Sequence, residues 1–229
     1  MLNYEIEPAV LQPLVPVGTE LDFWNGKTFV SMVGFNFINT RVRGIPIPFH
    51  RNFAEVNLRF YVRRNTAAGA RRGVVFIREL VPRRAIAWTA RIFYNEPYLT
   101  LPMSHQIEKD PDRLEEVKSA AYLWRFQGRE NFLKLITCGG MQPLAENSEA
   151  EFITEHYWGY TSQRDGSTLE YQVEHPRWRI WESQTAELHC DIAGLYGEVF
   201  CNALNSSPAS AFLAEGSPVT VYKGIRLKP

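Results

Sequence analysis

The sequence is poor in lysine, in cysteine and in long apolar runs, and each scarcity excludes a class of protein. Only six of the 25 basic residues are lysines. The three cysteines are odd in number and show no C-x-x-C spacing, which argues against a disulfide scaffold or a zinc site. No apolar run approaches the length that crosses a bilayer, and the first residues are acidic where a signal peptide is basic. We therefore expect a cytoplasmic protein with no membrane partner.

The overall composition predicts one folded domain that covers residues 1–229. Hydrophobic residues make up 45% of the chain and aromatic residues 13%, which is enough for a sizeable core. Acidic and basic residues number 25 each, so the net charge is zero. This balance removes the electrostatic argument for a nucleic acid partner. The excess of arginine over lysine suits carboxylate recognition, although arginine also forms ordinary surface ion pairs.

Most of the chain reads as short strands joined by turns. Residues Thr28–Phe37 form an apolar run that follows an Asn25-Gly26 turn, and Gly34 within it indicates a bulge or a close backbone approach. Residues Val56–Arg63 alternate between apolar and polar, with Asn57, Arg59, Tyr61 and Arg63 on one face. Further strands are expected over Gly73–Leu80 and Ala85–Tyr94. Because the links between them are short, the pairing should be antiparallel.

Two short helices are expected among about ten strands. Ser148 and Glu151 have the spacing of a capping box, which predicts a helix over Glu149–His156. Asp191 would cap a second helix over residues 192–204, whose apolar stripe includes Val199. Such a stripe is normally core packing. The pattern as a whole indicates an α+β, mainly β domain.

Familiar catalytic motifs do not occur in the sequence. The five histidines show no H-E-x-x-H spacing, and there is no G-x-S-x-G elbow, phosphate loop or dinucleotide fingerprint. We therefore expect neither a metal nor a cofactor. A buried lysine could form an imine with a carbonyl substrate, but only Lys134 lies in a good strand, where an outward position is expected.

The stretch from His50 to Tyr98 carries polar residues within strands and is the predicted site. Glu79 lies in an apolar segment, so it should have a cationic or hydrogen-bonding partner, which Arg59 could supply. One interpretation is a structural ion pair. The other is a carboxylate-binding arginine beside a general acid or base. In the second interpretation Glu79 is the catalytic residue, and the substrate-binding residues are His50, Asn57, Arg59, Arg91, Asn95, Glu96 and Tyr98.

Four long segments resemble a known family. They are RVRGIPIPFHRNFAEVNLRFYVR, GVVFIREL, ARIFYNEPY and the C-terminal AFLAEGSPVTVYKG, and they are similar to the uncharacterised YqjF-like proteins of bacteria. The resemblance runs from about Leu14 to the C-terminus. It implies an acetoacetate decarboxylase-like fold, which is an antiparallel β-barrel that encloses a small-molecule cavity, here with a few short flanking helices.

The resemblance also shows where the chemistry differs. The decarboxylase carries its imine-forming lysine in a Pro-Lys-Lys segment a few residues after an arginine. Arg91 and Pro97 could match that arginine and proline, but Tyr98 and Leu99 stand where the lysines would be. The imine-forming nucleophile is therefore missing, while Arg59, Glu79 and Glu96 could still line the cavity.

Two functions remain open at this point. The first is a barrel that binds a small organic acid or carbonyl compound, with any catalysis being acid–base chemistry without lysine. The second is a non-catalytic ligand-binding or protein-interaction module whose arginines and glutamates satisfy one another. Exposed edge strands also make a homodimer possible.

Overall fold

A computed structural model describes residues 1–39, 41–42, 45–46, 52–82, 97–113 and 115–228, with only the backbone for 41–42 and 45–46. The helices are short: α1 (Pro8–Leu11), α3 (Glu149–Thr154), α4 (Ile192–Tyr196) and α5 (Cys201–Leu204), with 3-10 turns at Gln12–Leu14 and Glu198–Phe200. The strands are β1 (Leu2–Ile6), β2 (Glu20–Leu21), β3 (Thr28–Phe37), β4 (Arg41–Val42), β5 (Ile45–Pro46), β6 (Phe53–Thr66), β7 (Gly69–Val81), β8 (Tyr98–Thr100), β9 (Met103–Lys109), β10 (Val117–Phe126), β11 (Arg129–Pro143), β12 (Trp158–Ser162), β13 (Thr168–Glu174), β14 (Arg179–His189), β15 (Ser210–Ala214), β16 (Thr220–Val221) and β17 (Ile225–Leu227).

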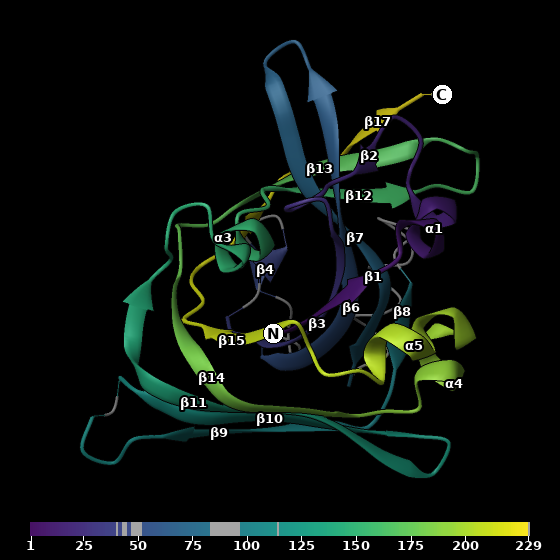
Figure 1. Cartoon of the computed structure of the whole chain (residues 1–229). Coiled ribbons are helices and arrows are strands. Elements are labelled where there is room, and N and C mark those ends of the chain that lie inside the picture. The colour runs from purple at the N-terminus through teal and green to yellow at the C-terminus, as the bar shows by residue number, and fades with distance from the viewer. Residues whose placement is uncertain (40, 43–44, 47–51, 83–96, 114, 229) are drawn as a thin grey trace.

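One sheet of fifteen strands dominates the described part of the chain. Its hydrogen-bonded path runs β16-β13-β12-β7-β6-β3-β1-β15-β14-β11-β10-β9, and β2, β8 and β17 pair beside this path. The sheet curves strongly, so β9, β10, β11 and β14 form a layer beneath β1, β3 and β6, with α4 and α5 at one side (Figure 1). This confirms the predicted α+β, mainly β fold.

The pairing differs from a purely antiparallel barrel in two ways. Among the described strands, the path has two open ends at β9 and β16. In addition, β7 pairs in parallel with both β12 and β8. A parallel neighbour needs a long connection, and β7 and β8 are separated by enough residues for one. The predicted strand over residues 85–94 lies outside the described residues.

The strand over Thr28–Phe37 is confirmed with the predicted bounds, and so is the turn before it. Asn25 and Gly26 both have positive φ, as that turn requires. Gly34 marks a close approach: a Cβ at this position would lie 2.5 Å from the ring of Tyr122 on β10. The register between β3 and β6 is continuous at Gly34, so there is no bulge there. Glycine therefore lets the two layers meet at this point.

The helix predictions are confirmed in position but not in length. Ser148 caps α3 by accepting from the Glu151 N–H, yet the helix ends at Thr154 rather than at His156. Asp191 caps α4 in the same way. The single helix predicted over residues 192–204 is wrong, because Gly197 adopts φ 103° and breaks it into short pieces. The break turns Val199 outward, where it is 63% exposed.

Two apolar clusters lie on opposite faces of β6. Val56, Leu58, Phe60 and Val62 join a large core between the layers, closed by residues of α4 and α5. Tyr61 belongs to a second core with Phe152 and Ile153 of α3, among other residues. The central strand is thus covered on both faces from Phe53 to Val62, where its polar residues are buried or half-buried, and it becomes exposed from Arg63 onward.

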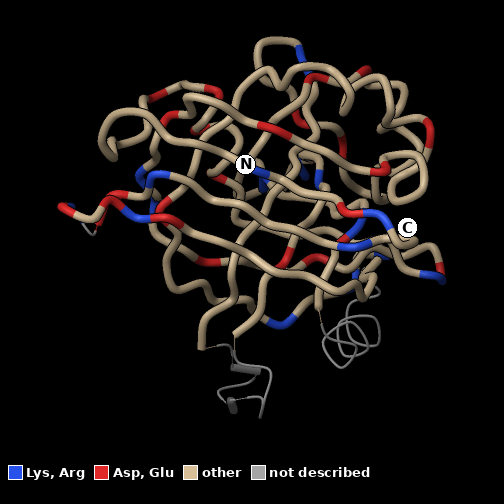
Figure 2. The backbone as a smooth tube through the Cα atoms, turned by 90° about the horizontal axis from the view of Figure 1, so that it is seen from below, with Lys and Arg blue, Asp and Glu red and all other residues tan. Residues whose placement is uncertain are grey.

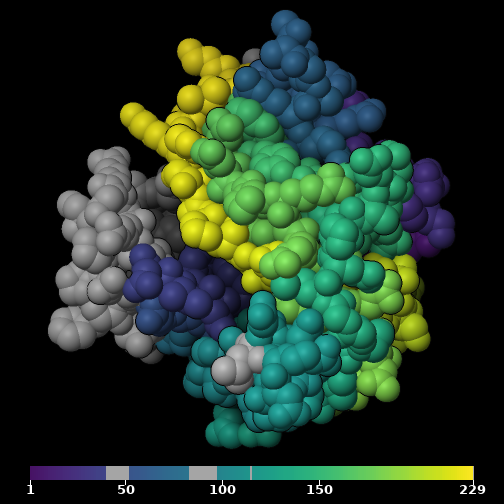
Figure 3. Space-filling model, turned by 90° about the vertical axis from the view of Figure 1, so that its left-hand side faces the viewer, coloured from purple at the N-terminus to yellow at the C-terminus, as the bar shows by residue number. Residues whose placement is uncertain are grey.

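Charged residues are dispersed along the described chain. Figure 2 shows acidic and basic residues scattered along the backbone. The C-terminal segment, yellow in Figure 3, lies against green strands, because β16 and β17 both pair with β13.

In the described residues, no helix is long and apolar enough to cross a membrane.

Replacing Gly34 with alanine should destabilise the fold by about 1–3 kcal/mol, the usual cost of overpacking a filled core. The added methyl group would clash with the Tyr122 ring, which is itself buried between the layers. Gly140→Ala is the matched control, since its Cβ would meet only the Glu116 Oε1 at 3.5 Å. Urea unfolding of the two variants measures the difference. Equal stabilities would contradict the close packing at Gly34.

Candidate functional site

A row of polar side chains runs along one buried face of β6. Side chains alternate between faces in a strand, so Glu55, Asn57, Arg59 and Tyr61 point the same way. Glu55 and Asn57 are each 1% exposed, and Arg59 is half-buried. Buried polar groups of this kind are costly unless they find hydrogen-bond partners. The row therefore identifies the polar part of the interior.

The sheet register brings residues of β7 and β8 to the same place. Glu79 lies opposite Asn57, and Tyr98 is the parallel neighbour of Glu79. The Asn57 amide donates to Glu55 Oε1 at 3.1 Å, and the Tyr98 hydroxyl donates to Glu55 Oε2 at 3.4 Å. We refer to Glu55, Asn57, Glu79 and Tyr98 as the carboxylate cluster.

The carboxylate cluster holds two glutamates that are almost fully buried. Glu79, like Glu55, is 1% exposed. Buried carboxyl groups beside other polar side chains are common participants in acid–base chemistry. The Asn57 Oδ1 is buried and has no hydrogen-bond partner among the described residues. This oxygen can therefore accept a hydrogen bond from a ligand.

Arg59 is turned away from the carboxylate cluster. A register shift between Leu58 and Arg59 places Arg59 opposite Phe76. Its guanidinium donates to the Ile153 carbonyl at 3.4 Å and lies 5.7 Å from the centre of the Tyr61 ring. The strand register therefore does not favour the expected ion pair between Arg59 and Glu79. Asn57, and not Arg59, lies opposite Glu79.

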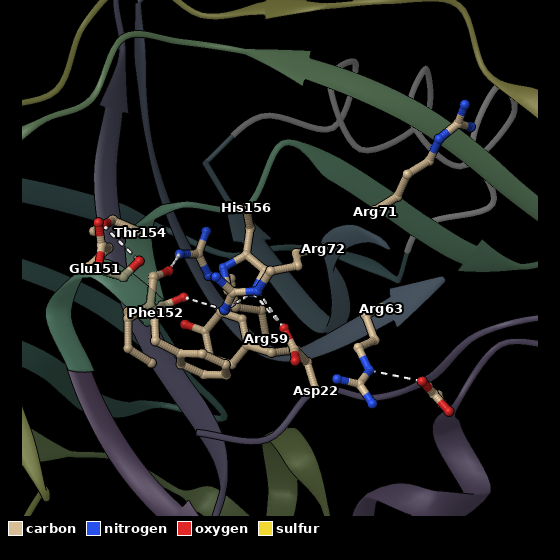
Figure 4. A network of polar contacts seen from close by, with 12 residues as sticks. Asp22, Arg59, Arg63, Arg71, Arg72, Glu151, Phe152, Thr154 and His156 are labelled. Atoms are coloured by element: carbon tan, nitrogen blue, oxygen red, sulfur yellow. Dashed lines mark hydrogen bonds and ion pairs between the residues drawn. The ribbon is translucent and has the colours of Figure 1, made fainter. Parts of the chain in front are cut away.

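A second polar group lies beside Arg59 (Figure 4). Asp22, Arg72 and His156 form it, and we call it the histidine cluster. Arg72 Nε donates to Asp22 Oδ2 at 2.6 Å, and its Nη2 lies 3.2 Å from the Phe152 carbonyl and 3.4 Å from His156 Nε2. The last carbonyls of a helix have no partner within the helix. Arg59 and Arg72 satisfy two of them at the end of α3.

Burial controls the protonation of the histidine cluster. Burial lowers the pKa of His156 to about 4, although the nearby Asp22 carboxylate acts to raise it. The positive charges of Arg72 and Arg59 lower this pKa further. Burial alone would raise the pKa of Asp22, but the nearby His156 ring and the hydrogen bond from Arg72 outweigh it and hold that pKa below its usual value. At neutral pH His156 is therefore uncharged and Asp22 is ionised.

The structure gathers part of the predicted site. Asn57, Glu79 and Tyr98 meet in the carboxylate cluster, and Arg59 follows on the same face of β6. His50, Arg91, Asn95 and Glu96 lie outside the described residues, so their roles stay predictions.

Sequence reasoning missed Glu55 and the whole histidine cluster. The alternation of β6 begins before Val56, so extending it by one residue would have found Glu55. Nothing in the pattern around His156 pointed to Asp22 or Arg72, which are far from it in the chain. In the parts of the chain that are described, no three histidine, cysteine or acidic side chains converge as metal ligands.

The low pKa of His156 makes the stability of the protein depend on pH. In the unfolded chain a histidine takes its proton near pH 6.5, whereas the folded protein resists it until about pH 4. The free energy of unfolding should thus fall as the pH drops from 6.5 to 4, by at most about 1.4 kcal/mol per pH unit from this group. Arg59, Arg72, Asp22 and the Tyr61 ring surround it.

The slope is measured by chemical unfolding at several pH values, with His156→Asn as the comparison. Above pH 5 Asp22 stays ionised in both proteins, so the difference between the slopes in the upper part of the window isolates His156. Identical slopes across the whole window would show that folding leaves the proton affinity of His156 unchanged.

Comparison with known proteins identifies the family of this chain. A family model described as an uncharacterized conserved protein, DUF2071, matches residues 1–218. The uncharacterized protein YqjF of Bacillus subtilis is 30% identical over 197 residues, which cover 83% of this chain and 74% of YqjF.

Solved structures share the fold at low sequence identity. An acetoacetate decarboxylase-like enzyme from Sphingomonas wittichii has a TM-score of 0.61 at 14% identity and covers 99% of this chain and 89% of its own. Acetoacetate decarboxylase from Legionella pneumophila has a TM-score of 0.57 at 14% identity, with 99% and 83% covered. The enduracididine biosynthesis enzyme MppR complexed with pyruvate has a TM-score of 0.59 at 11% identity, with 94% and 86% covered. The fold is thus acetoacetate decarboxylase-like, and the chain belongs to the DUF2071 family of uncharacterized conserved proteins.

Proposed function

We propose that the protein binds a small organic acid or carbonyl compound at the carboxylate cluster. The observation that carries this proposal is the combination of two buried glutamates with the partnerless Asn57 Oδ1. A ligand hydroxyl, or a carboxylic acid in its protonated form, would donate to that oxygen. Concave sites with a few convergent polar groups are the usual sites of small ligands. MppR, a structural neighbour, has been solved with pyruvate bound.

Any catalysis at this site would use Glu79 as the acid or base. Glu79 lies opposite Asn57, and Glu55 accepts from both Asn57 and Tyr98. In this arrangement Asn57 and Tyr98 hold Glu55, and Glu79 can exchange a proton with a bound ligand.

Lysine would have no part in this chemistry. Lys134 is half-buried on β11, and the other five lysines are exposed. The imine route is therefore not part of the proposal. We also propose that the protein is cytoplasmic and forms a homodimer.

The alternative is a non-catalytic module whose polar residues are structural. One observation favours it: this chain does build a buried structural ion pair elsewhere. Glu170 is fully buried and binds Arg71 at 2.6 Å and Arg64 at 3.1 Å. If the carboxylate cluster has the same purpose, substitutions there will change stability but not ligand binding.

A thermal-shift measurement on the Glu79→Gln variant distinguishes the two proposed functions. With pyruvate or acetoacetate at ten times Kd, a binding site gains about 1.4 kcal/mol, which raises the Tm by roughly 3–5 °C. We expect the wild type to show this rise with at least one compound in a screen of small acids and ketones. Glu79→Gln should lose it, because the amide can neither accept nor release the proton.

Glu170→Gln is the matched control, as a buried glutamate in an ion pair. It should lower the Tm without ligand and keep the rise with ligand. If Glu79→Gln behaves in the same way as Glu170→Gln, the structural alternative is correct.

Reduction with borohydride tests the absence of imine chemistry. An imine between a lysine and acetoacetate would be trapped as a stable secondary amine. Because the lysines are exposed or half-buried on β11, we expect mass spectrometry of the digested protein to find no adduct on any of them. A modified lysine at stoichiometric yield would overturn the lysine-independent mechanism.

A further inference from the structure

His156 is a buried polar side chain that the proposed chemistry does not use. It follows α3, and its side chain is only 2% exposed. Its Nδ1 has no hydrogen-bond partner among the described residues. Buried polar atoms nearly always have a partner, so an atom without one indicates a ligand or an ordered water. The direction of the missing hydrogen bond depends on which ring nitrogen carries the proton.

The neighbours of His156 place that proton on Nδ1. Arg72 lies 3.4 Å from Nε2, and a guanidinium can only donate, so Nε2 must be the acceptor. Asp22 lies 3.7 Å from the same nitrogen, beyond hydrogen-bond range, and Arg72 already binds its carboxylate at 2.6 Å. A neutral imidazole with Nε2 accepting carries its hydrogen on Nδ1. Nδ1 is therefore a donor.

A second donor without a partner belongs to Arg59, whose charge acts on His156. The Arg59 Nε is buried and makes no hydrogen bond within the described residues, and Arg59 takes part in no ion pair there. Arg59 and His156 both contact the Tyr61 ring, and the charge of Arg59 reaches His156. Figure 4 shows both side chains in the same polar network, beside Asp22 and Arg72. This network therefore contains two buried polar atoms, the Arg59 Nε and the His156 Nδ1, that have no hydrogen-bond partner among the described residues.

We propose that Arg59 and His156 form a carboxylate-binding subsite. The Arg59 Nε–H and the His156 Nδ1–H would donate to an anionic oxygen, and the guanidinium would compensate its charge. Arg72 and Asp22 position the imidazole by fixing its proton on Nδ1. The subsite extends the proposed function, on which it rests: Arg59 follows Asn57 by two residues on the same face, roughly 7 Å along the strand. The two sites thus begin on the same face of β6.

Two substitutions of His156 separate the ring nitrogens. Asparagine keeps a donor near the position of Nδ1, whereas glutamine keeps a polar group near Nε2 and loses the donor at Nδ1. We expect His156→Asn to bind acetate within about threefold of the wild type. His156→Gln and Arg59→Met should each bind it about tenfold more weakly, the loss expected for one hydrogen bond to a charged group. Acetamide, which has no charge, should bind far more weakly than acetate to the wild type. NMR titration measures the affinities.

Separate probes distinguish this subsite from the carboxylate cluster. Acetone, a carbonyl compound without a carboxylate, tests the cluster alone: its binding should be sensitive to Glu79→Gln and not to His156→Gln. Acetate should show the reverse. If acetone binds with the expected sensitivity but acetate binding survives His156→Gln, the subsite is wrong and the proposed function stands.

The nitrogen shifts of the wild-type imidazole provide a test that needs no variant. They should show a protonated Nδ1 and an unprotonated Nε2 at neutral pH, and Nδ1 should be the nitrogen that moves when acetate is added. A proton on Nε2, or an Nδ1 signal that acetate leaves unchanged, would overturn the proposal even if both variants failed to fold.

Discussion

The burial of β6 on both faces is the constraint on which the rest of the structure depends. One face carries Val56, Leu58, Phe60 and Val62, and it forms the core between the two layers of the curved sheet. The other face carries Glu55, Asn57, Arg59 and Tyr61, and α3 covers part of it. Apolar burial on the first face stabilises the fold. The polar groups of the second face lose contact with water as a result, so each needs a partner inside the protein.

Some of these polar groups have hydrogen-bond partners inside the protein and others do not. We expect ligand binding at the atoms that lack a partner. Glu55 accepts from Asn57 and Tyr98, and Arg59 donates to the end of α3. The Asn57 Oδ1, the Arg59 Nε and the His156 Nδ1 are among the buried atoms that have no hydrogen-bond partner in the described part of the chain. One is an acceptor and two are donors. A small molecule with a polar group at each end would match this pattern. The ion pairs around Glu170 show that the same chain can also satisfy a buried carboxylate completely with its own arginines.

Local signals predicted the elements that depend on local chemistry. The Asn25-Gly26 turn, the strand over Thr28–Phe37 and the Ser148 cap are all as expected, because turns and caps depend on a few adjacent residues. The single helix over residues 192–204 was predicted wrongly, because a glycine inside an apolar stripe can leave the helical conformation. Val199 fits an apolar helical stripe, yet Gly197 takes a positive φ and turns it outward.

The sequence by itself determined the class of fold, the alternation of β6 and the absence of a lysine where Tyr98 stands. These follow from residue type and spacing, which the chain carries in every conformation. Only the tertiary structure decided that both faces of β6 are buried, that Glu79 lies opposite Asn57, and that His156 meets Arg72. Those contacts join residues far apart in the chain. Their geometry comes from strand register and from the packing of α3, which no local pattern encodes.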